Sequence, residues 1–531
     1  MDGTAQVTPS TSCTRRHRDA ACKFRTRRGA VQIKAQPIPT SGRPAFDHHL
    51  GSLLAGDASS LAPLTALYNS HGWQPPPPAR RDGGLWLLST ETIGRLPPPP
   101  AAPSRAMAYG TPWFEEHLKG GIPHVACARP PGAPLPSRAL KYAQLGMCCI
   151  LDNARLWPAA EDKWRHRAYL SQQLRAVDCS VLCSPSQSKR FSYWFDASGY
   201  SDRVQAGYQA KPYVTTKTMG IDQFLTASQQ RNGSSLLYLQ QSILQAPNEN
   251  PTALQPCKGL GPGILSDIQS GIDLPAVKAL AEAGGFGPWQ RCQLFIGGKA
   301  AEGARSILHF DQYDNLFVQL SGTKTFILYD PQQTKHLYAY PIHHPLDTRS
   351  QVDLNDREGC TKAYPRLNNA IGHKITLHAG QALFLPCYWW HEVLTEPTDD
   401  ELTVSVNFWF AATNRLLTPT RPLVPCMQCE CARQLEYLIS DSLHDQAKLV
   451  PTFLSGLLAA IEAGGRGSSY TDALEALRPA SVTRSEWCGL FEYVVVQLAW
   501  LLGPEPVSGA EMAAFVSDLC DASRFAQLRL N

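Results

Sequence analysis

The chain has 531 residues, 43% of them hydrophobic, which is enough to bury a large core and to hold more than one domain. Its formal net charge is +4, and eight Lys or Arg against two Asp give residues 1–35 a charge of +6, so the rest sums to −2. This balance argues against a basic nucleic-acid-binding face in the folded part.

The N-terminal quarter of the chain differs from the rest in composition. Residues 1–35 are basic and rich in Ser, Thr and Arg, which is typical of an organellar transit peptide or of a disordered basic arm. Residues 36–133 contain the runs Pro75–Pro78 and Pro97–Pro100, which indicate a poorly ordered region. We expect the protein in the cytoplasm, the nucleus or both, or in an organelle if the head directs import.

The first residues with recognisable chemistry are His309-Phe310-Asp311. In a strand, residues i and i+2 point to the same side, so His309 and Asp311 can face one metal ion. Residues 314–329 follow as two predicted strands with a turn at Ser321-Gly322. On the second strand Lys324 shares a face with apolar residues, and a buried ammonium needs an anionic partner.

The third potential ligand is His391, which follows a bend at Pro386 in an apolar stretch. Two histidines and one carboxylate on one face are the ligand set of non-haem Fe(II) oxygenases, which keep coordination positions open. Residues 402–410 then alternate strictly, and their polar face includes Asn407 and Trp409 as candidates for a co-substrate and substrate pocket. Short strands separated by turns predict a mainly β fold, a double-stranded β-helix of the jelly-roll or cupin type with flanking helices.

The C-terminal part is predicted to be helical. Apolar residues at helical spacing indicate helices in residues 432–443, 451–461 and 487–502. The last of these contains Glu492 and Gln497 and is short for a membrane span, so no membrane association is expected. We divide the chain into a head (1–35), a Pro-rich region (36–133), an oxygenase domain (134–415), a helix pair (416–465) and a C-terminal helical extension (466–531).

The 16 cysteines lie singly or in adjacent pairs, which favours reduced thiols. The run Cys426–Cys431 has spacing that could suggest zinc, but no second cluster of matching spacing follows it.

The stretch from Leu294 to Phe410 resembles the JmjC-type 2-oxoglutarate oxygenases, most closely the asparaginyl hydroxylases of the type called factor inhibiting hypoxia-inducible factor. The resemblance also includes Tyr238–Gln241, which lies before this stretch. The matching segments are Tyr238–Gln241, His309–Asp311, Asn315–Lys324, Tyr338–Pro345, Ser350–Asp353, Tyr388–His391 and Val406–Trp409.

The resemblance implies a role for each matching position. Fe(II) would be held by His309, Asp311 and His391. 2-Oxoglutarate would be held by Lys324 through its C5 carboxylate, by the hydroxyls of Tyr238 and Ser306, by the polar groups of Asn315 and Asn407, and by the walls Phe317 and Trp409. Gln240 matches a contact to the peptide substrate.

The main departure from the family pattern is Thr348-Arg349, where the family has an Arg-Gln pair that contacts substrate. Arg349 stays a candidate substrate contact, and the choice of substrate is open.

The function implied by the resemblance is hydroxylation at the β-carbon of asparagine, or of a related side chain, in ankyrin-repeat partner proteins. O2 and 2-oxoglutarate would be consumed, with succinate and CO2 as products. The resemblance also implies a homodimer formed by the C-terminal helices. The alternatives are another JmjC oxygenase, either a histone lysyl demethylase or a tRNA-nucleoside hydroxylase, and a cupin-type binding protein without catalysis. The intact triad and Lys324 argue against the last.

Overall fold

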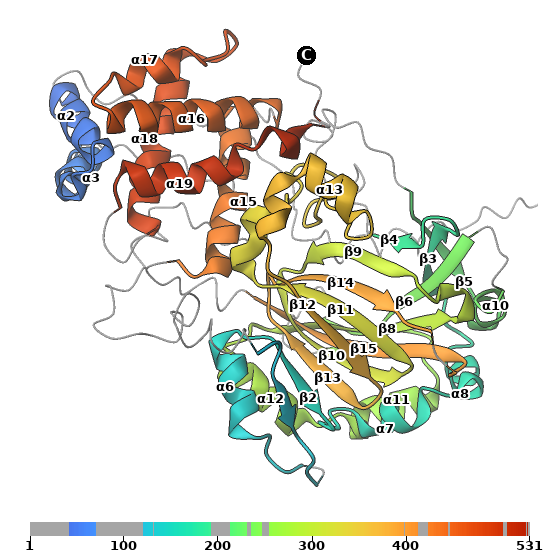
Figure 1. The fold of residues 1–531 in the computed structure, drawn as a ribbon. Coiled ribbons are helices and arrows are strands. Elements are labelled where there is room, and N and C mark those ends of the chain that lie inside the picture. The colour runs from blue at the N-terminus through green and yellow to red at the C-terminus, as the bar shows by residue number, and fades with distance from the viewer. Residues whose placement is uncertain are drawn as a thin grey trace, which may run out of the picture.

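The computed structural model describes residues 42–70, 120–130, 132–192, 213–230, 235–246, 254–397, 399–412, 423–443, 447–502, 507–526 and 528. The basic head and both proline runs lie outside these residues. Within them the chain forms a β-sandwich with flanking helices and a separate cluster of helices (Figure 1). The predicted jelly-roll architecture is confirmed.

The larger sheet has ten strands, nine of them in the order β1-β2-β13-β10-β15-β8-β6-β3-β5, with β7 paired to β6. Their bounds are β1 His124–Ala126, β2 Cys149–Asp152, β13 Gln381–Leu385, β10 Tyr313–Ser321, β15 Leu402–Ala411, β8 Trp289–Gly298, β6 Ser235–Gln245, β3 Cys179–Pro185, β5 Thr215–Met219 and β7 Gln255–Pro256.

The smaller sheet has five strands in the order β12-β11-β14-β9-β4 and packs over the larger one (Figure 1). Their bounds are β12 His373–His378, β11 Thr323–Tyr329, β14 Trp390–Thr395, β9 Arg305–Phe310 and β4 Arg190–Phe191.

The outer face of the larger sheet is covered by short helices (Figure 1). They are α6 Ser137–Leu145, α7 Pro158–Lys163, α8 Arg167–Gln173, α11 Pro262–Gly271 and α12 Leu274–Gly284, while α10 Ile221–Ala227 lies near β5.

The alternation of β15 explains how the sandwich is layered. Leu402, Val404, Val406 and Phe408 are at most 1% exposed, and the ring of Phe408 lies 5.8 Å from that of Trp157, beside α7. The apolar face of β15 therefore packs outward against helices, and its polar face is turned toward the other sheet.

The turn between β10 and β11 falls at Gly322, as predicted. Its φ of +71° is a conformation that L side chains rarely adopt, and an added Cβ would lie 2.7 Å from the Thr403 hydroxyl oxygen. The turn leads directly into β11, which carries Lys324 and pairs with β14.

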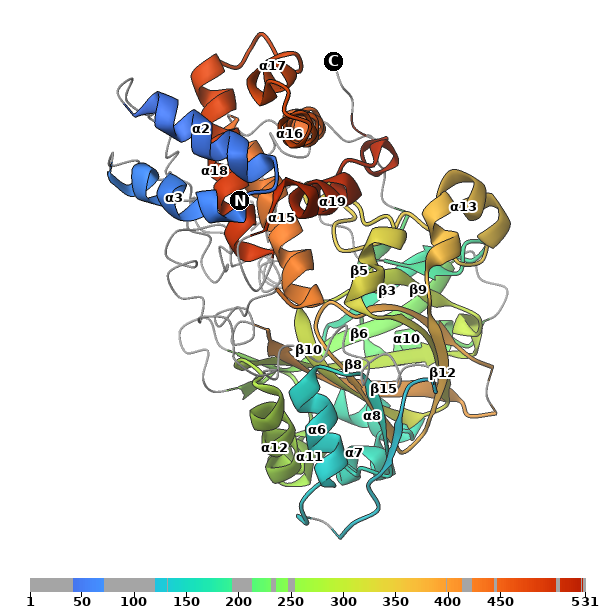
Figure 2. The same ribbon diagram turned by 60° about the vertical axis from the view of Figure 1, so that its left-hand side comes forward.

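The second hydrophobic cluster is mainly helical, lies beside one end of the sandwich (Figure 2) and includes strand residues such as Phe310 and Trp390. It contains α2 Arg43–Leu54, α3 Leu61–Ser70, α15 Pro425–Ser442, α16 Val450–Gly465, α17 Tyr470–Glu475, α18 Arg484–Leu501 and α19 Gly509–Leu519, while α13 Arg357–Ala363 packs nearby. The three predicted C-terminal helices are observed as α15, α16 and α18. The apolar segment Ala447–Gly465 has the length and composition of a membrane span, but 61% of it is buried, as in the core helix of a folded domain.

Helices α2 and α3 lie in the region predicted to be poorly ordered, so the structure differs from that prediction. Gly464 and Gly509 let α2 approach closely, because a Cβ on Gly464 would lie 2.7 Å from the Leu54 side chain. The Arg43 guanidinium also forms a 2.6 Å ion pair with the buried Glu492 of α18. Tertiary packing thus orders a segment whose flanking prolines suggested a linker.

Candidate active site

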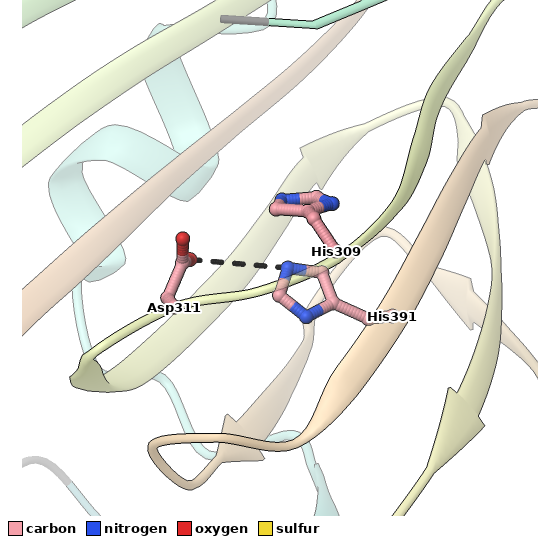
Figure 3. Close-up of side chains that lie close together, drawn as sticks. All are labelled: His309, Asp311 and His391. Carbon is pink, nitrogen blue, oxygen red and sulfur yellow. Dashed lines mark ion pairs between the residues drawn. The ribbon is translucent and has the colours of Figure 1, made fainter. Parts of the chain in front are cut away.

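The three predicted iron ligands are brought together by two neighbouring strands. His309 on β9 is paired with His391 on β14, and Asp311 follows β9 directly. The imidazole centroids are 4.1 Å apart, and the His391 Nε2 is 3.8 Å from an Asp311 carboxylate oxygen (Figure 3). One ligand atom from each residue lies within 4.8 Å of the others, so the donor set fits a single metal ion.

Both imidazoles are held in the form that binds a metal. The His309 Nδ1 lies 2.7 Å from the Ile307 carbonyl oxygen, and the His391 Nδ1 lies 3.0 Å from that of Trp389. Because a carbonyl oxygen only accepts, each Nδ1 carries the proton and each Nε2 keeps its lone pair. Burial lowers the pKa of both imidazoles, so they stay neutral near pH 7.

Lys324 lies on β11, the strand beside β14, and is 2% exposed. Its ammonium donates to the Tyr238 hydroxyl at 2.8 Å and to the Ser405 hydroxyl at 2.7 Å. Its Nζ lies 4.9–5.5 Å from the ring centroids of Phe317, Tyr238 and Phe295.

Burial lowers the Lys324 pKa to about 7, and among the described residues no carboxylate pairs with it. A buried ammonium held by neutral groups alone is suited to an anionic guest.

Ser306 reaches the inner face through a β-bulge. Strict alternation would put Ser306 and His309 on opposite faces, since their separation is odd. The register between β14 and β9 shifts, however, so that His391 pairs with His309 and Val393 pairs with Ser306. The bulge therefore turns Ser306 to the side that carries the histidines.

Four further predicted co-substrate residues form a block on β10 and β15. Asn315 pairs with Trp409, and Phe317 pairs with Asn407. Asn407 accepts a 3.0 Å hydrogen bond from the Gln293 backbone N–H. On β6, the predicted substrate contact Gln240 is 8% exposed, and its amide oxygen, like that of Asn315, has no partner in the described part of the chain.

Arg349 lies beside the triad, in an isolated bridge with His309. Its guanidinium donates to the Thr348 hydroxyl at 2.7 Å and to the Asp347 carbonyl at 2.8 Å, and its charge lowers the pKa of both triad histidines. The position agrees with a substrate contact, which stays a prediction.

The sequence reasoning missed a network that ties α15 to the triad. Tyr388, which has a φ of +65°, donates its backbone N–H to the Asp311 carbonyl at 2.8 Å, and its hydroxyl bonds the buried Glu430 carboxylate of α15. Gln312 donates to both, at 3.1 Å to Tyr388 and 3.3 Å to Glu430. Gln312 and Glu430 are 118 residues apart, and no local pattern marks the pair.

A second tie joins the same helix to the segment that carries Arg349. The Arg433 guanidinium binds both carboxylate oxygens of Asp347, which is 3% exposed. Bidentate arginine pairs fix orientation as well as distance. Helix α15 therefore supports two of the segments that surround the metal-binding residues.

Comparison with known proteins places the sandwich in a family. The family described as "cupin-like domain" matches residues 140–415. The chain is 38% identical over 109 residues to the Arabidopsis thaliana protein named lysine-specific demethylase JMJ31, covering 20% of this chain and 19% of that protein. It is 35% identical over 102 residues to the human tRNA wybutosine-synthesizing protein 5, covering 19% of this chain and 29% of that protein.

A longer match is to the human protein named bifunctional peptidase and (3S)-lysyl hydroxylase JMJD7. It is 26% identical over 282 residues, which cover 49% of this chain and 76% of that protein. For the two preceding relatives the chain spans less than a third of their length. The predicted JmjC-type family is thus supported by hydroxylase and demethylase relatives, whereas the closer likeness to asparaginyl hydroxylases stays a prediction.

Proposed function

This chain belongs to the cupin-like domain family, and on that premise we propose that it is an Fe(II)- and 2-oxoglutarate-dependent protein hydroxylase. The observation that carries the proposal is the triad itself: three ligand atoms within 4.8 Å of one another, with both imidazoles protonated on the nitrogen that faces away from the metal position. Lys324 adds an ammonium group that can bind the carboxylate at the end of 2-oxoglutarate distant from the metal.

The residues of the site would bind the metal and the co-substrate separately. His309, Asp311 and His391 would hold Fe(II). Lys324 would bind the C5 carboxylate of 2-oxoglutarate, with the Tyr238 hydroxyl orienting the ammonium. The aromatic rings around that ammonium exclude water, which strengthens the ion pair once it forms.

When bound, Fe(II) would activate O2 so that one oxygen atom enters a substrate C–H bond as a hydroxyl and the other enters 2-oxoglutarate, which loses CO2 to become succinate.

For the substrate we propose asparagine, or a related side chain, in an ankyrin-repeat-type protein, hydroxylated at the β-carbon. The support is the shared segments around Gln240, Asn407 and Trp409, whereas Arg349 departs from the pattern. The names of the relatives favour a lysine side chain or a tRNA nucleoside as the alternative targets. The homodimer through the C-terminal helices and the location of the protein in the cytoplasm, nucleus or an organelle stay predictions.

The experiment measures succinate formed by the full chain with Fe(II), 2-oxoglutarate and O2. We expect His309→Ala and Asp311→Ala to abolish succinate formation, and His378→Ala, which changes an exposed histidine of β12, to leave it intact. Unchanged turnover in the triad variants would contradict the proposal. Mass spectrometry of ankyrin-repeat peptides then identifies the residue that gains one oxygen atom.

A further inference from the structure

A guanidinium and an indole lie side by side on the inner face of the larger sheet. Arg291 on β8 pairs with Trp409 on β15, and its guanidinium carbon lies 5.4 Å from the Trp409 ring centroid. Tyr313 on β10, the strand on the other side of β15, stacks on the same indole with centroids 5.4 Å apart and planes at 11°. The three side chains form one continuous row across the sheet.

The row starts beside the triad. Tyr313 opens β10 only two residues after Asp311, so the chain of neighbours runs from the metal-binding carboxylate through Tyr313 and Trp409 to Arg291. The two ring distances add to about 11 Å at most, which an extended peptide spans in about three residues. Asp311 lies two residues before Tyr313, which adds up to roughly 7 Å. A guest held at the triad can therefore reach Arg291 with a side chain about five residues away.

Two groups of the row, the Trp409 indole and the Arg291 guanidinium, are donors without an acceptor among the described residues. The Trp409 indole N–H is buried and has no hydrogen-bond partner in the described ranges. The Arg291 guanidinium forms no ion pair or hydrogen bond with any residue that the structure describes. Indole and guanidinium groups can only donate, so the buried Trp409 N–H is unsatisfied until an acceptor arrives, and the half-buried Arg291 guanidinium can bind the same acceptor.

We propose that Arg291 and Trp409 form a subsite for a substrate carboxylate, so that the enzyme selects protein segments with an acidic residue within about five positions of the oxidised one. The inference rests on the proposed function and deepens it. A carboxylate matches both donors, because it accepts the paired N–H groups of an arginine.

A peptide fits the charge of the chain better than a nucleic acid does. The residues outside the basic head sum to −2, so their net charge does not favour binding to a phosphate backbone. A lysine-rich segment is disfavoured as well, since its ammonium groups would face the Arg291 guanidinium.

The test uses the full chain with Fe(II), 2-oxoglutarate and three pools of short peptides. Every pool has an equal mixture of asparagine and lysine at its centre, and the flanking positions carry aspartate, asparagine or lysine. The measured quantities are the oxygen-atom mass gain of each pool and the succinate formed. The variants are Arg291→Gln, Arg291→Glu and the matched control Arg138→Gln, an exposed arginine held 5.5 Å from the Tyr142 ring centroid.

We expect the aspartate pool to be oxidised roughly tenfold faster than the asparagine pool, the effect of a hydrogen bond to a charged group. Arg291→Gln should remove that ratio, and Arg291→Glu should shift the preference to the lysine pool. Arg138→Gln should keep the wild-type ratio. If the Arg291 variants lose their native circular dichroism, Trp409→Phe replaces them, because it keeps an aromatic ring and removes only the N–H donor; it should reduce the ratio severalfold.

The outcomes separate the two hypotheses. If the wild-type chain forms no succinate with any pool or without peptide, the proposed function fails. If succinate forms but the aspartate pool is no faster than the asparagine pool, or the ratio survives Arg291→Gln, the carboxylate subsite is refuted while the enzyme class stands. Acceleration by single-stranded RNA instead of the aspartate pool would also overturn the inference.

Discussion

Replacing Lys324 by methionine should stabilise the protein without co-substrate while it abolishes co-substrate binding. Burial lowers the lysine pKa from 10.5 to about 7. Each tenfold loss of proton affinity corresponds to about 1.4 kcal/mol, so the buried lysine costs on the order of 4 kcal/mol at neutral pH. Methionine removes that cost but loses two hydrogen bonds to hydroxyls, each contributing about 1 kcal/mol. The expected net gain is about 2 kcal/mol.

The sign of the pH dependence gives a second readout. Between pH 7 and pH 10.5 the unfolded chain holds a proton on this lysine that the folded protein has lost, so wild-type stability rises with pH in that window. The advantage of Lys324→Met should therefore be largest at or below pH 7 and should shrink toward pH 10. Urea denaturation at pH 7 and pH 9.5 measures both effects.

Two controls make the result specific. Lys374→Met changes an exposed lysine on the neighbouring strand β12 and should alter the denaturation midpoint little at either pH. Added 2-oxoglutarate should raise the midpoint of the wild type and not that of Lys324→Met. If Lys324→Met is less stable than the wild type at pH 7, the reasoning about an unpaired buried ammonium is refuted.

Three other predictions concern pH and distant residues. The affinity for 2-oxoglutarate should fall by up to tenfold for each pH unit above pH 7, because a neutral Lys324 must take up a proton to bind the C5 carboxylate. Calorimetry in buffers of different ionisation enthalpy should show that proton uptake. A pH-independent affinity would contradict the prediction. Glu430→Gln should weaken Fe(II) binding about 10–100-fold with the sandwich still folded, because Glu430 holds residues next to the metal ligands. The control Glu462→Gln, at an exposed position of α16, should leave Fe(II) binding unchanged. Equal metal affinities of the two variants by titration would refute the role of α15. Burial raises the Glu492 pKa to about 7, so the folded protein holds a proton there that the unfolded chain loses above pH 4.5. Stability should therefore fall as pH rises from 4.5 to 7, and Glu492→Gln should flatten this pH dependence in thermal unfolding. An unchanged pH dependence would rule out Glu492 as its source.

The sequence alone determined the features that depend on local periodicity. The alternation of residues 402–410 defined a strand with one polar face, and the i, i+2 spacing put His309 and Asp311 on one side. The turn at Gly322 and the apolar neighbours of Lys324 predicted a buried ammonium near them. These predictions succeed because a strand has a period of two whatever it later packs against.

Only the tertiary structure decided the features that depend on strand pairing and on contacts distant in sequence. A shift of register turned Ser306 inward, contrary to its odd spacing from His309. Glu430 bonds Gln312 and Tyr388 beside the triad, from a helix whose predicted range began only at residue 432. Arg291 gained its neighbour Trp409 from the pairing of β8 with β15. A single sequence carries no local record of such partners. Each contact joins segments that are far apart in the chain, so it depends on how the strands and helices pack and not on the residues next to it.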